Sequence, residues 1–88
     1  MGAMSEQLTD RERRILDLEA RMPRHGGAKE EAIRGELSLT PARYYLLLDR
    51  LLDAEAALAY DPLLVRRLRR VRDEGARRRA QRVSGAAG

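Results

Sequence analysis

Apolar residues recur at helical spacing in several segments of the chain, and no segment alternates apolar and polar residues as a strand does. The first helical segment follows Thr9, and Glu12 three residues later completes the signature of a capping box. It should end at about Met22, because the residue before Pro23 avoids helical backbone. The pattern therefore predicts a first helix between these two signals.

Two further helices are predicted on either side of a short turn. Residues 28–37 place apolar side chains on one face, although Gly35 costs about 1 kcal/mol relative to alanine inside a helix. Thr40 caps the next helix, and Pro41 occupies its first position, where a missing N–H is tolerated. This helix is expected over residues 40–52. Its apolar face consists of Tyr44, Leu47, Leu48 and Leu51.

The alanine-rich stretch DAEAALAY either extends the third helix or forms a separate turn. Asp61 and Pro62 repeat the arrangement of a cap followed by proline, so a fourth helix is expected from Pro62 to about Arg79. Its narrow apolar stripe is formed by Leu64, Leu68 and Val71. We expect this stripe to pack on the first and third helices, or alternatively to form a dimer seam.

A length of 88 residues predicts one domain, which we describe as all-α with four helices. The helical domain is placed at residues 8–74, between a flexible N-terminus at 1–7 and a basic, disordered tail at 75–88. Residues 1–3 could be a remnant of cloning, with a native start at Met4. No apolar stretch approaches the roughly 18 residues that a membrane-spanning helix needs.

Charge is distributed unevenly along the chain. Residues 66–82 contain nine arginines and two acidic residues, a net charge of +7, whereas the other residues carry nine basic and twelve acidic side chains, a net of −3. This asymmetry indicates a polyanionic partner, because guanidinium groups match phosphate oxygens and a dense cluster releases counterions. RNA, a membrane surface and a merely solvated face are the alternatives. A membrane is the weakest of them, because the stripe is narrow and the chain has no Trp or Phe.

No catalytic, metal or cofactor site is expected. The chain has no cysteine, which excludes disulfides and thiolate zinc sites. His25 is the single histidine and stands in a loop, so we interpret it as a surface residue. Glu12 is interpreted as a cap, and Glu19 as a surface or buried ion-pair residue. The sequence therefore predicts neither an enzyme nor a small-molecule substrate.

Two short helices joined by a turn at residues 38–39 match the helix-turn-helix motif, whose second helix enters a DNA major groove about 12 Å wide. Such a helix needs a slim, polar leading end. Here that end consists of Thr40, Pro41, Ala42 and Arg43. We favour a base-edge or phosphate contact for Arg43 over a solvated surface position. Backbone contacts are assigned to Lys29, Tyr45, Arg50, Arg66, Arg67, Arg69 and Arg70.

The stretches LTDRERRILDL and EEAIRGELSLTPARYYLLLDRLL resemble region 4 of bacterial sigma-70 factors and related response-regulator output domains. Residues 8–72 are also similar to a family of short, uncharacterised actinobacterial helix-turn-helix proteins. The matching pieces are LTDRERRILDLE, GAKEEAIRGELSLTPARYYLLLDRLLD and ALAYDPLLVRRLRRVR. The resemblance implies a helix-turn-helix fold that binds double-stranded DNA in the cytoplasm, at the nucleoid.

Two positions depart from the general motif. Ser38 stands at the turn, where glycine is usual, and Arg34 stands where a small alanine normally packs against the next helix. Either the register is shifted by two, so that Ala32 lies at the contact, or the helices cross differently.

The sequence thus predicts a transcriptional regulator with helix 40–52 in the major groove. One copy reads only about half a turn of DNA, so a homodimer or tandem binding is expected. If the arginine-rich helix dominates the binding energy, the protein is instead nucleoid-associated with weak sequence preference. If Leu46, Leu48 and Leu52 are exposed, it is instead a module that binds RNA polymerase or a sigma or anti-sigma partner.

Overall fold

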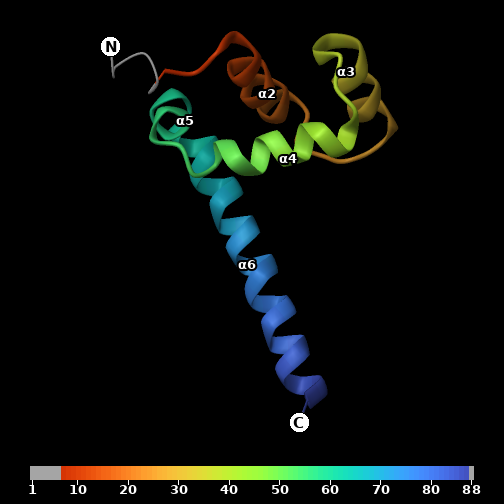
Figure 1. The fold of residues 1–88 in the computed structure, drawn as a ribbon, viewed down its shortest axis with the longest axis vertical. Helices are drawn as coiled ribbons and strands as arrows, with labels where there is room; N and C mark the ends of the chain where they lie inside the picture. The colour runs from red at the N-terminus through yellow and green to blue at the C-terminus, as the bar shows by residue number, and fades with distance from the viewer. Residues whose placement is uncertain (1–6, 88) are drawn as a thin grey trace.

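The computed structural model describes residues 7–87, with side chains described for residues 7–82, and these residues form five helices and no strand. Most of the predicted flexible N-terminus therefore lies outside the described residues. The helices are α2 (Asp10–Arg21), α3 (Gly27–Leu37), α4 (Pro41–Leu51), α5 (Glu55–Tyr60) and α6 (Pro62–Ala87). In Figure 1, α2 to α5 gather into a body, and α6 leads away from it as a single helix.

Helix α2 begins and ends where its local sequence predicts. Thr9 Oγ1 accepts the N–H of Glu12 at 3.1 Å, and Glu12 Oε1 accepts the N–H of Thr9 at 2.8 Å, which completes the capping box. At the other end, Met22 is the C-cap, immediately before Pro23. Both predicted ends are confirmed.

The starts of α4 and α6 are likewise set by side-chain caps. Thr40 Oγ1 accepts the N–H of Arg43 at 3.2 Å, one residue before the proline that opens α4. Asp61 Oδ1 accepts the N–H of Leu64 at 3.3 Å at the start of α6. Each cap satisfies a backbone donor that has no partner within its own helix.

The core lies between α2, α3 and α4 and is closed by α5 and the first turns of α6. Its buried apolar residues are Ile15, Leu16, Leu18, Ile33, Leu37, Leu39, Tyr44, Leu48, Leu51, Leu52, Ala57, Leu64 and Val65. The predicted apolar face of α4 is confirmed, with Leu47 partly buried at its edge. Burying each large aliphatic side chain contributes about 1.5–3 kcal/mol, so this cluster is the main support of the body.

A separate short helix, α5, brings the number of helices in residues 7–87 to five and corrects the predicted four. Backbone bonds from the N–H of Asp53 to the Arg50 carbonyl and from the N–H of Ala54 to the Leu51 carbonyl close a turn after α4. The chain then re-enters a helix that buries Ala57. The sequence left this stretch open, because alanine-rich residues favour a helix without indicating where it breaks.

Helix α6 continues to Ala87, past the Arg79 at which the pattern placed its end. The segment predicted to be a disordered tail is thus helical through Ala87. A helix that is already nucleated by packing propagates readily through alanine, arginine and glutamine, which are good helix formers. Apolar periodicity is a guide to burial and does not mark where such a helix stops.

Candidate nucleic-acid interface

Helices α3 and α4 are joined by a three-residue connection from Ser38 to Thr40. Ser38 has φ 55° and ψ 37°, the left-handed conformation that glycine usually adopts at such a reversal. Its N–H donates to the Arg34 carbonyl at 3.1 Å, which ends α3. Leu39 is buried beside it and fixes the angle at which the chain enters α4. Serine therefore makes the turn here, at a cost of roughly 1–2 kcal/mol relative to ordinary backbone.

The unusual arginine in α3 does not enter the contact between the two helices. The Arg34 side chain is exposed, while Ala32 is partly buried and packs against the core. Of the two alternatives that the sequence left open, this arrangement favours the register with Ala32 at the contact. The small side chain of Ala32 packs against the core, and the long side chain of Arg34 extends into solvent.

One side of α4 is packed and the opposite side is exposed. Successive residues turn by roughly 100° around a helix axis, so residues spaced by three, four and seven share a face. The exposed residues are Ala42, Arg43, Leu46, Asp49 and Arg50. At the leading end, Thr40 is exposed and Pro41 is half-buried. The predicted leading end and Arg50 therefore lie on an accessible surface.

Lys29 is not available to DNA, so its predicted phosphate contact is wrong. Its side chain is 0% exposed, and Nζ lies 2.8 Å from Oε1 of Glu19, which is itself buried. The approach forms an ion pair without hydrogen-bond alignment, so Nζ has no hydrogen-bond partner among the described residues. The cation also lies 5.8 Å and 5.4 Å from the ring centroids of Tyr44 and Tyr45. The first turn of α3 faces α2, and the lysine there is the counter-charge of a buried carboxylate.

Tyr44 belongs to the same buried cluster, as the sequence predicted when it placed this residue in the core. Its hydroxyl donates to Oε1 of Glu19 at 2.8 Å, and the Ile15 carbonyl lies 3.3 Å away. Burial and the hydrogen bond to the Glu19 carboxylate raise the pKa of Tyr44 well above its ordinary value. The phenol therefore stays neutral and serves to tie α4 to α2.

Tyr45 is half-buried, and its hydroxyl is already engaged. It lies 2.6 Å from Nδ1 of His25, and the two rings make an edge contact with centroids 5.0 Å apart. The prediction that this hydroxyl reaches a phosphate is therefore not supported, because it binds a side chain of the same chain. His25 is exposed, as predicted for a loop residue, although it is not isolated.

Two arginines of α6 attach that helix to the end of α4. Arg69 is half-buried, and its Nε donates to the Leu52 carbonyl, whereas Arg72 Nη1 donates to Asp53 Oδ1 at 3.0 Å. The hydrogen bond with Asp53 raises the pKa of the Arg72 guanidinium. A cation at the negative end of α4 is also favoured by the helix dipole. Arg69, predicted to contact DNA, is thus committed to holding α6 in place.

The remaining predicted arginines of α6 point away from the body. Arg66, Arg67 and Arg70 are exposed, and Arg66 and Arg70 are one turn apart on the same side of the helix. Arg77 continues this line two turns further along and is also exposed. These side chains remain free for a partner outside the body.

The patch of three leucines considered for a protein partner does not form. Leu48 and Leu52 are only 6% and 5% exposed and belong to the core. Leu46 alone is exposed, at 43%, in the middle of the open face of α4. Packing of α4 against α2 and α3 buries Leu48, and Leu52 belongs to the same core cluster.

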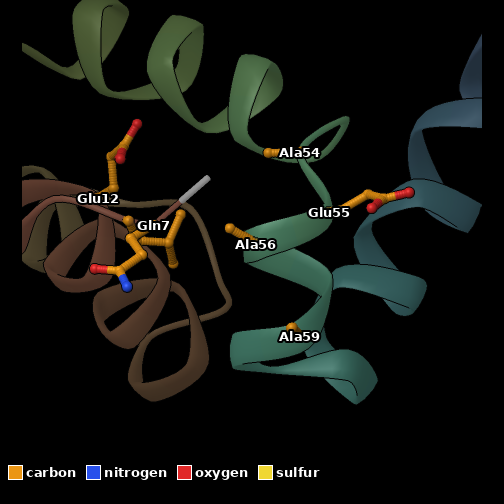
Figure 2. Close-up of a pocket in the computed structure, with 7 residues that line it drawn as sticks. Gln7, Glu12, Ala54, Glu55, Ala56 and Ala59 are labelled. Atoms are coloured by element: carbon orange, nitrogen blue, oxygen red, sulfur yellow. The ribbon is translucent and has the colours of Figure 1, made fainter. Parts of the chain in front are cut away.

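One cavity of the described residues offers little chemistry for binding a ligand. Figure 2 shows a cavity between α2 and α5. Its volume is about 540 Å³. It is lined by Gln7, Leu8, Glu12, Ala54, Glu55, Ala56 and Ala59. The Glu12 carboxylate is occupied by the cap of α2, and the alanines present only methyl groups. Within residues 7–87, moreover, no three side chains of metal-ligating type come together.

These features define a small all-helical protein, and none of its described helices is long and apolar enough to cross a membrane. The model of a family described as "Protein of unknown function (DUF3263)" matches residues 7–81, and the chain belongs to this family. The matched range covers α2 to α5 and most of α6, so the family model also describes the part of α6 that leads away from the body. No curated protein and no solved structure matches the chain.

Proposed function

We propose that this protein binds double-stranded DNA as a transcriptional regulator, with α3 and α4 acting as a helix-turn-helix. The unit formed by α3, the left-handed Ser38 and α4 carries the proposal. Its second helix has an exposed, slim start and is held from behind by the core, as a helix that enters a major groove must be.

The exposed face of α4 is suited to reading base edges. A helix about 10–12 Å in diameter fits a major groove roughly 12 Å wide. On this face, Arg43 can pair with guanine, and Leu46 can contact the methyl group of thymine. Asp49 can accept a hydrogen bond from the amino group of cytosine, whereas a phosphate would repel it. The mixture of side chains therefore favours sequence readout over a purely electrostatic contact.

Phosphate contacts would set the orientation of the protein on the duplex. At the start of α4, the Arg43 N–H is already capped by Thr40 and Pro41 has no N–H, so the Thr40 hydroxyl hydrogen and the Ala42 N–H are the donors that could bind a phosphate. At the opposite end of α4, Arg50 and the exposed arginines of α6 add positive charge. A single copy covers about half a turn, so a useful regulator needs a second copy or tandem sites.

The test measures fluorescence anisotropy of random and genomic-fragment duplexes over a series of salt concentrations. Removing a bidentate contact to guanine costs about 1–3 kcal/mol of discrimination, so Arg43→Ala should weaken binding to a preferred fragment by about tenfold or more. Binding to random DNA should fall much less. Arg14→Ala is the matched control, because it removes one exposed arginine from α2, on the side that faces α3.

Three other results would point to a different function, reading helix or partner. A steep salt dependence without any fragment preference means a nucleoid-associated protein whose binding is dominated by α6. Equal losses from Arg43→Ala and Arg14→Ala exclude α4 as the reading helix. Absence of binding at low salt rejects DNA as the partner and leaves a protein partner at the exposed Leu46, such as RNA polymerase or a sigma factor.

A further inference from the structure

Helix α6 has two halves with different surroundings. In the first half, Leu64 and Val65 are buried and Leu68 is half-buried against the body. In the second half, every side chain from Ala76 to Arg82 is exposed. Figure 1 shows this second half extending beyond the other helices. The projecting half, residues 73–82, therefore has open surface on all sides from Ala76 onward.

The arginines of the projecting half are spread around the helix. Arg77, Arg78 and Arg79 are consecutive, so at roughly 100° per residue they cover about 200° of the circumference. Arg82 falls within the same arc. In the packed half, by contrast, the arginines of the inner side are already bonded to the end of α4 and to Asp53. In the packed half, the exposed arginines therefore lie on a single side of the helix. In the projecting half, the arginines lie on opposite sides of it.

Apart from the helix propensity of its alanines and arginines, little within the chain stabilises the projecting half as a helix. A helix that is polar all round gains nothing from burial, and Gly75 costs about 1 kcal/mol relative to alanine. Arg78 and Arg82 form a repulsive pair four residues apart. Asp73 and Glu74, each four residues before an arginine, supply only a few tenths of a kcal/mol. A polyanion on both sides would remove the repulsion and hold the helix.

We propose that the projecting half of α6 is a second groove-binding element, which lies as one helix in a DNA major groove and reaches phosphates of both strands. The inference rests on the proposed function, because its ligand is the same duplex DNA. A helix 10–12 Å across fills a groove about 12 Å wide, so arginines on opposite sides meet the two flanking backbones. Helix α4 cannot bind in this way, because one of its faces is packed on the core.

The deciding property is helical conformation, as distinct from charge. Ala76→Pro with Ala80→Pro leaves every charge unchanged but breaks the helix, since each interior proline costs about 3 kcal/mol or more. Ala76→Ser with Ala80→Ser is the matched control that keeps the helix. In the full-length chain we expect the proline variant to bind duplex DNA at least tenfold more weakly, and the serine variant to bind within about twofold of the parent.

Two additional variants keep the result interpretable. Ala76→Gly with Ala80→Gly weakens the helix without kinking it and should give an intermediate affinity. Arg77→Gln, Arg78→Gln and Arg79→Gln together keep the helix and should lower the salt slope by roughly 2–3, close to one for each lost phosphate contact. Circular dichroism of each variant verifies that the body remains folded.

The outcomes separate this inference from the proposed function. Parental affinity and salt slope in the proline variant would overturn the groove-binding helix, while DNA binding itself would stand. Failure of the parental chain to bind duplex DNA at low salt would overturn both. Among the variants that leave every charge unchanged, a loss in the proline and glycine variants but not in the serine variant, graded with helix propensity, is the result expected from a groove-bound helix.

Discussion

The Lys29–Glu19 ion pair shows that the role of a residue depends on its neighbours in the fold. In sequence, Lys29 is a basic residue at the start of a helix beside a candidate DNA-reading unit. In the structure it is a fully buried cation, enclosed by Glu19 and two tyrosine rings. A buried ion pair contributes little net stability, but removing one partner leaves an uncompensated charge.

Lys29→Met should therefore destabilise the protein by about 3–5 kcal/mol, measured as the free energy of unfolding in urea. Lys29→Met combined with Glu19→Met removes both charges and should recover most of that loss. Tyr44 then keeps its contact with the Ile15 carbonyl. The folded double variant should bind DNA as the parent does. A clear drop in its affinity would contradict the buried position of Lys29 and restore it as a DNA contact.

Among the helices, α3 has weak local support. Its N-cap, Gly26, provides no side-chain hydrogen bond, and Gly35 lies in its interior. A methyl group added at either glycine would meet no atom within 4 Å, so space does not distinguish them. Backbone conformation distinguishes the two glycines, because Gly26 has φ 155°, where residues with a side chain are strained.

Gly35→Ala should stabilise the protein by about 0.5–1 kcal/mol, because alanine loses less conformational freedom in a helix. Gly26→Ala should destabilise it by roughly 1–3 kcal/mol, since that backbone region is open almost only to glycine. Thermal unfolding measures both: a change of 1 kcal/mol shifts the Tm of a domain this small by about 4–8 °C. Shifts of the same sign in the two variants would mean that the chain enters α3 with a different backbone conformation.

At the scale of the whole molecule, a packed body carries a helix whose far half stands alone. Stability should follow this division, because local opening is easiest where few apolar groups are buried. The amides of α4 around Leu48 should exchange hydrogen only on global unfolding, whereas those from Ala76 to Arg82 should exchange through local fraying. Native-state hydrogen exchange resolved by residue measures this gradient. Uniform protection along α6 in the free protein would mean that the projecting half is covered, as by a second copy.

Sequence reasoning was most successful for features that depend on residues within one helical turn. The capping box at Thr9, the Thr40 cap before Pro41 and the Asp61 cap before Pro62 are each made by atoms three residues apart. It was less successful for the candidate interface. Lys29 and Arg69 were both interpreted as DNA contacts, and both are held by groups that lie 10 and 17 residues earlier in the chain.

Local sequence patterns are therefore sufficient to establish that the described chain is helical, where α2, α4 and α6 begin, and which face of α4 is buried. These features follow from local hydrogen bonds and from the 3.6-residue period, which neighbouring residues encode. Contacts between the helices determine which basic side chains are buried or bonded and which remain free. That outcome depends on carboxylates and carbonyls supplied by other helices, and no local pattern specifies their approach. The body covers only the first half of α6, so the arginine-rich second half is exposed.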